Sequence, residues 1–241
     1  MSATPRRSAE NGDSTPTIVH VHPALTCCDA SWEAAYLRFE SREQEIAKFQ
    51  QRLLRLGATG WSRNAHIVEL FCGRGSALCA WEQLGYTRLD GVDLSESLLQ
   101  QYRGPATLYV CDARELPFAS QSRDIVAVQG GLHHLNLLPE DLDRTLSDAA
   151  RVLKPGGLFL ACEPWLTPFL SVVHHVSEIA LVRRLAPRID AFATMVDGER
   201  STYEAWLAQP SLILELLHRH FEPLQQRIRW GKLEFAGRKR D

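Results

Sequence analysis

The sequence predicts an α/β protein with a doubly wound, mostly parallel sheet, and three observations support this prediction. Short apolar runs alternate with segments of helical periodicity between residues 67 and 162. A glycine-containing turn follows the first of these runs. The chain has 241 residues, of which 45% are apolar, and this suffices for one such domain with an accessory element.

The expected strands and helices follow from the places where the apolar periodicity changes. The runs expected to form strands are residues 67–71, 89–93, 108–111, 124–129 and 158–162. The segments expected to form helices between them are residues 76–84, 96–102 and 139–153. The last of these helices has Pro139 in its first turn and ends before a breaker at residues 155–157. In such a sheet the ligand site lies beyond the carboxyl ends of the strands.

The segments on either side of this core differ from it in composition. Residues 1–16 lack apolar periodicity and are expected to form a disordered tail. The apolar positions of residues 31–56 recur every three or four residues, with an interruption near Ser41, and predict two helices. The expected units after the tail are an N-terminal helical cap over residues 17–60, an α/β core over 61–163, a helical lid over 164–210, and a final helix with a β-hairpin over 211–241.

Charge and cysteine usage exclude several classes of partner. The chain has 27 Lys and Arg against 29 Asp and Glu, so no net field favours nucleic acid or an anionic membrane. No apolar run approaches the roughly 18 to 20 residues that span a bilayer, which favours a cytoplasmic protein. The six cysteines form no CxxC pair and are expected to be free thiols. His20 and His22 precede Cys27 and Cys28, but this spacing matches no standard zinc template, and we expect no metal site.

Acidic residues at the ends of three consecutive strands indicate the kind of ligand. Glu69 stands near the turn that contains Gly73 and Gly75, where it would repel the pyrophosphate of a dinucleotide but attract the cationic groups of S-adenosylmethionine. Asp93 ends the second strand, about 20 residues after the turn, where a carboxylate can accept both hydroxyls of a ribose. Asp112 ends the third strand and is suited to accept from an adenine amine.

Five segments, in this order and at this spacing, resemble the motif set of class I S-adenosylmethionine-dependent methyltransferases. The segments are residues 69–75, 92–95, 111–118, 124–134 and 153–157. The resemblance implies a seven-stranded sheet whose last strand is antiparallel, and S-adenosylmethionine as cofactor. It implies roles for the backbone at Phe71, Gly73 and Gly75 beside the methionine part of the cofactor, for Asp93 and its neighbour Leu94 at the ribose, for Asp112 and Ala113 at the adenine, and for Gln129 near the sulfonium.

One residue departs from the pattern of this family. The position of Phe71 is usually the first glycine of the loop, and a benzyl side chain there would crowd the methionine end of the cofactor.

Candidate residues for chemistry follow the fourth and fifth strands. His133 and His134 lie just beyond the fourth strand, and either is a candidate general base if the acceptor is a hydroxyl; a loop hydrogen bond is the alternative. Glu163 and Trp165 follow the fifth strand and are expected to face the acceptor. Tyr203 and Trp206 lie in the inserted segment, in a helix expected to begin with a capping box at residues 201–204, and they either line the acceptor pocket or extend the core.

Three functions are compatible with these features. The first is a methyltransferase that acts on a small molecule by in-line transfer, the second acts on RNA or protein, and the third is a non-catalytic module that binds S-adenosylmethionine. The near-neutral charge and the absence of a nucleic-acid motif favour the first. The acceptor atom, catalytic competence and the oligomeric state are left open.

Overall fold

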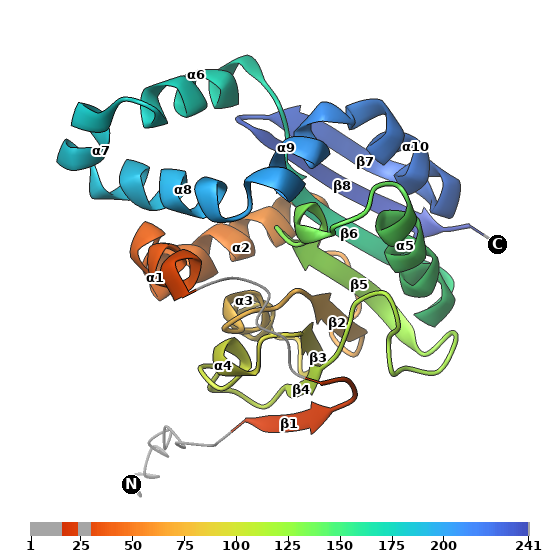
Figure 1. Ribbon diagram of the computed structural model, residues 1–241. Coiled ribbons are helices and arrows are strands. Elements are labelled where there is room, and N and C mark those ends of the chain that lie inside the picture. Colours follow the sequence, from red (N-terminus) through yellow and green to blue (C-terminus); the bar gives the residue numbers. More distant parts are fainter. Residues whose placement is uncertain (1–15, 24–29, 241) are drawn as a thin grey trace, which may run out of the picture.

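The computed structural model describes residues 16–23 and 30–240, and its centre is one eight-stranded sheet with the order β1-β4-β3-β2-β5-β6-β8-β7 (Figure 1). The strands are β1 (Thr17–His20), β2 (His66–Leu70), β3 (Arg88–Asp93), β4 (Thr107–Val110), β5 (Arg123–Gln129), β6 (Leu153–Pro164), β7 (Phe221–Arg229) and β8 (Lys232–Lys239). Strands β1 to β6 pair in parallel, whereas β8 is antiparallel to both β6 and β7. The doubly wound sheet and its antiparallel last strand are therefore confirmed.

Helices lie on both faces of the sheet and in the segment inserted after β6 (Figure 1). They are α1 (Ala30–Phe39), α2 (Arg42–Leu56), α3 (Ser76–Gln83), α4 (Glu96–Leu99), η1 (Leu132–His134), α5 (Glu140–Val152), α6 (Pro168–Ser177), α7 (Ala180–Leu185), α8 (Pro187–Gly198), α9 (Arg200–Ala208) and α10 (Pro210–His220). The break between α1 and α2 falls at Ser41, whose side chain and that of Gln44 complete a capping box. The two expected N-terminal helices and the helical insertion are thus present.

The structure has one strand more than the seven expected, because β1 adds to the sheet at the edge formed by β4. This strand lies within residues 17–60, for which only helices were expected. Its four residues are mostly exposed, so the apolar alternation that marks a half-buried strand is missing from the sequence. The tail expected over residues 1–16 lies outside the described residues except for residue 16.

Two local expectations were wrong. Strand β6 begins at Leu153 and runs through the breaker at residues 155–157, because Leu153 pairs with Arg123 and the register then shifts before Leu158 pairs with Ile125. Helix α9 begins at Arg200, and its N-cap Glu199 makes no side-chain cap bond, so residues 201–204 do not form a capping box. Glu204 instead accepts a hydrogen bond from Arg200 within the helix.

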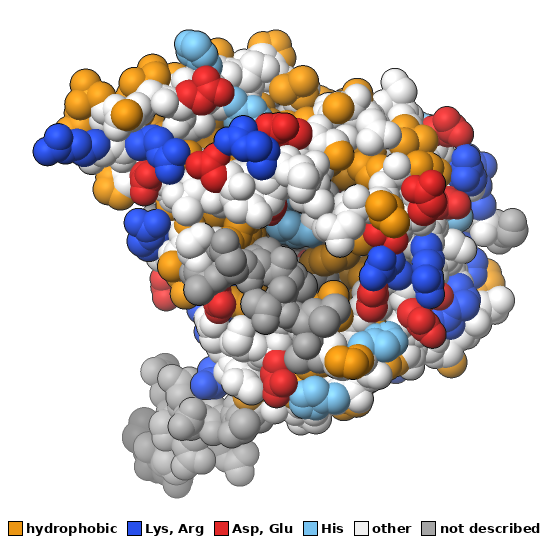
Figure 2. Space-filling view, in the orientation of Figure 1, with side chains coloured by type: hydrophobic (Ala, Val, Ile, Leu, Met, Phe, Trp, Pro, Cys, Tyr) orange, Lys and Arg blue, Asp and Glu red, His pale blue; other side chains and the backbone are white. Residues whose placement is uncertain are grey.

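The two faces of the sheet bury separate apolar clusters, each centred on a tryptophan. Trp81 of α3 is fully buried on one face, and Trp206 of α9 is 1% exposed on the other. Among the described residues, no helix has the length and apolarity needed to cross a bilayer. Along α6 and α7, apolar side chains such as Val172 and Leu185 are exposed. Figure 2 shows apolar side chains on the surface of this protruding end.

Candidate active site

A cavity of about 540 Å³ lies beyond the carboxyl ends of β2, β3, β4 and β5, where a doubly wound sheet binds ligands. Helix α1 and the α8–α9 junction complete its wall. The predicted site residues that line it are Glu69, Phe71, Gly73, Asp93, Leu94, Asp112, Ala113, Gln129 and His134. Segments far apart in the sequence therefore meet in one enclosed space.

The glycine turn between β2 and α3 is tied to the end of β3. Asp93 accepts hydrogen bonds from the backbone N–H of Gly73 at 2.8 Å and from that of Ser95 at 2.8 Å. Burial raises the pKa of its carboxyl group. Gly75 has a φ of +77°, and a Cβ there would lie 2.4 Å from the Tyr102 ring, so this glycine serves the packing of the turn and does not line the cavity.

Phe71 adopts a left-handed backbone conformation, with a φ of +54°, at the position where the family pattern has glycine. Its ring packs against Gly131, where a Cβ would lie 2.3 Å from the ring. The absence of a side chain at position 131 provides the space that the ring occupies, although Phe71 still lines the cavity.

Buried polar atoms without partners face the cavity from β2 and β5. Glu69 Oε2 accepts from the Trp81 indole N–H at 2.9 Å. Glu69 Oε1 and both amide atoms of Gln129 have no well-aligned hydrogen-bond partner among the described residues, although the two side chains are close enough for Gln129 to lower the pKa of Glu69. Burial outweighs this effect and raises the pKa of Glu69 to about 7. These atoms are poised to accept from and donate to a polar ligand.

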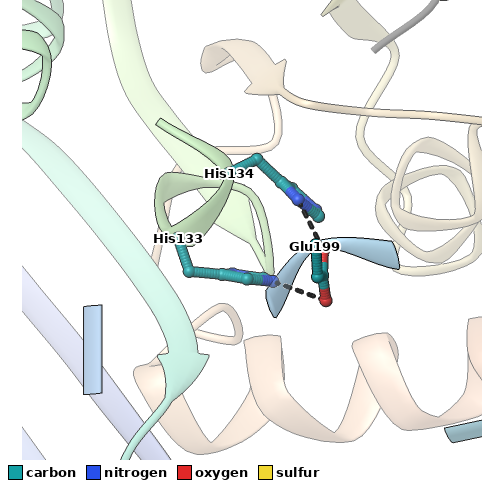
Figure 3. A group of neighbouring side chains, drawn as sticks. All are labelled: His133, His134 and Glu199. Atoms are coloured by element: carbon teal, nitrogen blue, oxygen red, sulfur yellow. Dashed lines mark ion pairs between the residues drawn. The ribbon is translucent and has the colours of Figure 1, made fainter. Parts of the chain in front are cut away.

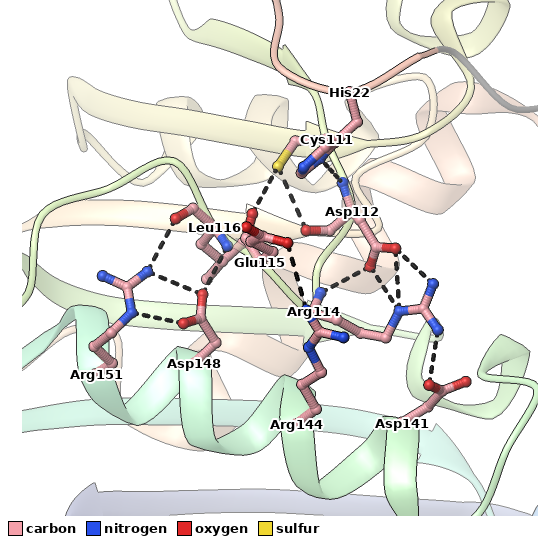
Figure 4. A network of polar contacts seen from close by, with 10 residues as sticks. All are labelled: His22, Cys111, Asp112, Arg114, Glu115, Leu116, Asp141, Arg144, Asp148 and Arg151. Atoms are coloured by element: carbon pink, nitrogen blue, oxygen red, sulfur yellow. Dashed lines mark hydrogen bonds and ion pairs between the residues drawn. The ribbon is translucent and has the colours of Figure 1, made fainter.

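The acid at the end of β4 is already engaged by a cation (Figure 4). Arg114 binds both oxygens of Asp112 and reaches Asp141 at 2.7 Å. Burial opposes the charge on Asp112, but Arg114 outweighs it and lowers the pKa of that carboxyl group. The ring of His22 accepts from the backbone N–H of Asp112 at 3.1 Å, which joins the segment after β1 to this edge. Ala113 remains on the cavity wall.

The two predicted histidines meet two glutamates beside the cavity, and Figure 3 shows both histidines with one of these glutamates, Glu199. His133 Nδ1 lies 2.7 Å from Glu163 Oε2, and His134 Nδ1 lies 2.7 Å from Glu199 Oε2. Glu163 Oε1 also accepts from the backbone N–H groups of Gly131 and Leu132, at 2.9 and 3.0 Å. Only His134 and Glu199 of this group line the cavity.

Environment separates the proton affinities of the two imidazoles. Burial and the neighbouring His134 lower the pKa of His133. Burial also opposes the charge on His134, but the neighbouring carboxylate of Glu199 outweighs it and raises the pKa of His134.

The other predicted acceptor residues do not line the cavity. Glu163 is fully buried behind His133, and Trp165 is 6% exposed in the core. Tyr203 lies 3.0 Å from His174 through its hydroxyl, and the Trp206 indole donates to the carbonyl of Pro164 at 2.9 Å. Their contact with an acceptor stays a prediction.

Sequence reasoning missed Glu199 as a site residue. It lies at the junction of α8 and α9, and no periodicity or motif distinguishes it from an exposed acid of an inserted helix. The apolar periodicity of residues 31–56 did mark part of the site, because Trp32 and Tyr36 of α1 belong to this pattern and line the cavity. Trp32 stacks on Tyr36 with ring centroids 5.4 Å apart and contacts His134 edge-on at 5.7 Å.

Comparisons with known proteins agree with this geometry. Residues 68–161 match the family model described as a methyltransferase domain. A demethylmenaquinone methyltransferase of Symbiobacterium thermophilum is 33% identical over 109 residues, which cover 41% of this chain and 42% of that protein. The match thus spans less than half the length of this curated relative.

Solved structures share the fold over most of the chain. The PH0226 protein of Pyrococcus horikoshii superposes with a TM-score of 0.65 at 17% identity, covering 88% of this chain and all of that one (100%). A geranyl diphosphate C-methyltransferase of Streptomyces coelicolor, solved with Mg²⁺, geranyl-S-thiolodiphosphate and S-adenosyl-L-homocysteine, gives 0.57 at 14% identity, covering 82% of this chain and 77% of that one. These likenesses confirm the predicted fold class.

Proposed function

We propose, because residues 68–161 match a family model described as a methyltransferase domain, that this chain transfers a methyl group from S-adenosylmethionine to a small-molecule acceptor. The observation that supports this most strongly is the pairing of a carboxylate-tied glycine turn with unsatisfied buried polar atoms in one cavity. A chain that binds the cofactor without catalysis would share the carboxylate-tied glycine turn. Turnover is therefore the decisive test.

The residues present fit the cofactor. The unpartnered Glu69 Oε1 and the Gln129 amide form a buried polar end, which suits the ammonium and carboxylate of the methionine part. Asp93 and Leu94 border the same cavity at the end of β3, where the ribose would lie. Ala113 would contact the adenine, whereas Asp112 would have to share its carboxylate with Arg114 to accept from the adenine amine.

S-adenosylmethionine, when bound, supplies a methyl group activated by its sulfonium. The task of the chain is then to align the nucleophilic atom of the acceptor with that methyl carbon and to exclude water. Trp32 of α1 and the α8–α9 junction line the cavity beside His134, and we assign the space beside them to the acceptor. The His134–Glu199 pair borders this space and is the place where a proton, or a cation that replaces it, would be held.

A small acceptor is favoured by the size and charge of the site. A cavity of about 540 Å³ falls within the range of small-molecule sites, and it must hold both substrates. The chain has a formal net charge of −2, which gives no attraction for RNA.

The buried thiols Cys72, Cys111 and Cys162 are free, and this supports a reducing compartment such as the cytoplasm.

Binding and turnover test the proposal separately. Calorimetric titration with S-adenosylhomocysteine should show saturable one-to-one binding. Incubation with methyl-labelled S-adenosylmethionine and pools of small hydroxyl, amine and carbon nucleophiles should then give a labelled product. Binding without any labelled product, while purified RNA or protein is labelled, would contradict the choice of acceptor class.

A further inference from the structure

We infer that His133, His134 and Glu199 form a binding site for one divalent transition-metal ion at the acceptor side of the cavity. From the sequence we expected no metal site at these residues. The inference rests on the proposed function only in assigning the adjoining space to the acceptor; the metal site itself rests on the geometry of these side chains.

The donor atoms are spaced as a metal requires. One ligand atom from each of the three residues lies within 4.8 Å of the other two. His134 Nδ1 is 2.7 Å from Glu199 Oε2, and His133 Nε2 is 3.8 Å from Glu199 Oε1 (Figure 3). Two ligands of a tetrahedral Zn²⁺ lie about 3.3 Å apart, given bonds of about 2.0 to 2.1 Å. The observed distances bracket this value, so small side-chain rotations suffice.

A buried carboxylate orients the first imidazole for ligation. Glu163 accepts from Gly131, Leu132 and His133 together, so its oxygens act as acceptors and we assign the ring hydrogen of His133 to Nδ1. The lone pair of His133 Nε2 then faces Glu199. Two acceptor atoms that face each other in a buried place repel one another unless a proton, a water molecule or a metal ion lies between them. The carboxylate–histidine–metal arrangement is the usual support of metal sites, which makes Glu163 a positioning residue.

Two elements that are far apart in the sequence supply the ligands. His133 and His134 belong to η1, which follows β5, whereas Glu199 joins α8 to α9 in the inserted segment. The side chains of His133 and Glu199 are each 9% exposed, and that of His134 is 24% exposed. A bound ion would therefore fasten the inserted helices to the core and present an open coordination position to the cavity.

The chemistry of the donors selects the class of ion. Two imidazole nitrogens and one carboxylate suit Zn²⁺, Fe²⁺ or Co²⁺, whereas Mg²⁺ and Ca²⁺ prefer an all-oxygen set. Three protein ligands leave a position free, as in catalytic rather than structural zinc sites. An acceptor with an oxygen or nitrogen donor would fill that position and lose its proton more easily. In that case the two histidines act as ligands and not as general bases.

Metal titration of the chelator-treated full chain tests the site. We expect one equivalent of Zn²⁺ to bind in calorimetry, and Co²⁺ to give visible d–d absorption without a sulfur charge-transfer band. Glu199→Gln, which keeps the shape of the side chain, should weaken Zn²⁺ binding at least tenfold, and Glu163→Gln about 10- to 100-fold. His175→Gln, an exposed histidine on α6, is the matched control and should leave binding unchanged.

Two further measurements keep the result interpretable. The titrations are repeated in a Cys27→Ser/Cys28→Ser background. This removes, as competing ligands, the two thiols that follow His20 and His22 in the sequence. Circular dichroism and S-adenosylhomocysteine binding show whether each variant is folded, and the latter tests the proposed function separately from the metal. Failure of the wild-type chain to bind Zn²⁺, or equal binding by folded Glu199→Gln, would overturn the inference.

Discussion

The ring of Phe71 occupies the space that a side chain at Gly131 would need, with the nearest ring atom 2.3 Å from a Cβ at that position. This contact joins the turn after β2 to the turn after β5. The glycine that the family pattern places at position 71 is thus replaced by a phenylalanine, and the ring is accommodated by the glycine at position 131.

Substitution at these two positions should be strongly coupled. Gly131→Ala should lower the free energy of unfolding by about 1 to 3 kcal/mol, because the added methyl group collides with the ring. In a Phe71→Gly background the same change should cost much less, since the ring is gone and glycine tolerates the φ of +54°. Urea unfolding of the wild type, the two single variants and the double variant measures the coupling. If the losses of unfolding free energy in the two single variants add up to the loss in the double variant, the contact is unimportant.

Loss of the Asp93 carboxylate should weaken cofactor binding. Asp93→Ala removes the acceptor that holds the Gly73 N–H and the proposed ribose contact, and we expect a loss of about 1 to 3 kcal/mol in the binding of S-adenosylhomocysteine. Asp143→Ala on α5, whose carboxylate pairs with His220 and does not line the cavity, is the control and should bind like the wild type. Equal affinity of the two variants in calorimetry would refute the assignment of Asp93.

The buried carboxyl of Glu69 predicts a pH dependence of binding. Its pKa is raised to about 7 by burial, and an ammonium group beside it would favour the ionised form. Affinity for S-adenosylhomocysteine should therefore rise as the pH increases from about 6 to 8, with release of a proton on binding. Glu69→Gln should remove this dependence. Titration in two buffers of different ionisation enthalpy measures the proton, and a wild-type curve as flat as that of the variant would contradict the role.

The same group predicts the sign of a stability change. Because the pKa of Glu69 in the folded chain lies above the ordinary value of 4.5, the unfolded chain ionises first as the pH rises. The contribution of Glu69 to stability is fully present below pH 4.5 and is lost as the pH rises through about 7. Urea unfolding of wild type and Glu69→Gln at several pH values should show this difference, which would be absent if the carboxyl were solvated.

Two tryptophans near the inserted segment should behave differently. Trp206→Phe leaves the buried carbonyl of Pro164 without its donor, so stability should fall by about 1 to 3 kcal/mol while cofactor affinity stays within threefold. Trp32→Phe changes the cavity wall and should impair turnover. Trp230→Phe, at a position 62% exposed, is the control for loss of an indole. A stable Trp206→Phe variant with lost turnover would instead place Trp206 at the acceptor.

The sequence predicted the strands of the core because each has an apolar run that differs in period from the helix beside it. The same alternation placed Glu69, Asp93 and Asp112 at neighbouring strand ends, and all three line one cavity. Strand β1 was missed because its pairing with β4 buries little of it. Backbone pairing rather than side-chain burial defines this strand, so a search for hydrophobic patterns in the sequence does not detect it.

The partners of individual side chains could not be predicted from the sequence for a related reason. The engagement of Asp112 by Arg114 depends on where a flexible side chain turns. The contact between Glu199 and His134 joins residues that are 65 positions apart in the sequence. It therefore depends on how the inserted helices pack on the core.

The most direct test of the central claim is calorimetric titration of the full chain with S-adenosylhomocysteine, beside a parallel titration with a nicotinamide dinucleotide. The proposed site predicts one-to-one binding of the first ligand and none of the second, because Glu69 borders the place where a pyrophosphate would lie. Binding of the dinucleotide with no response to S-adenosylhomocysteine would contradict it.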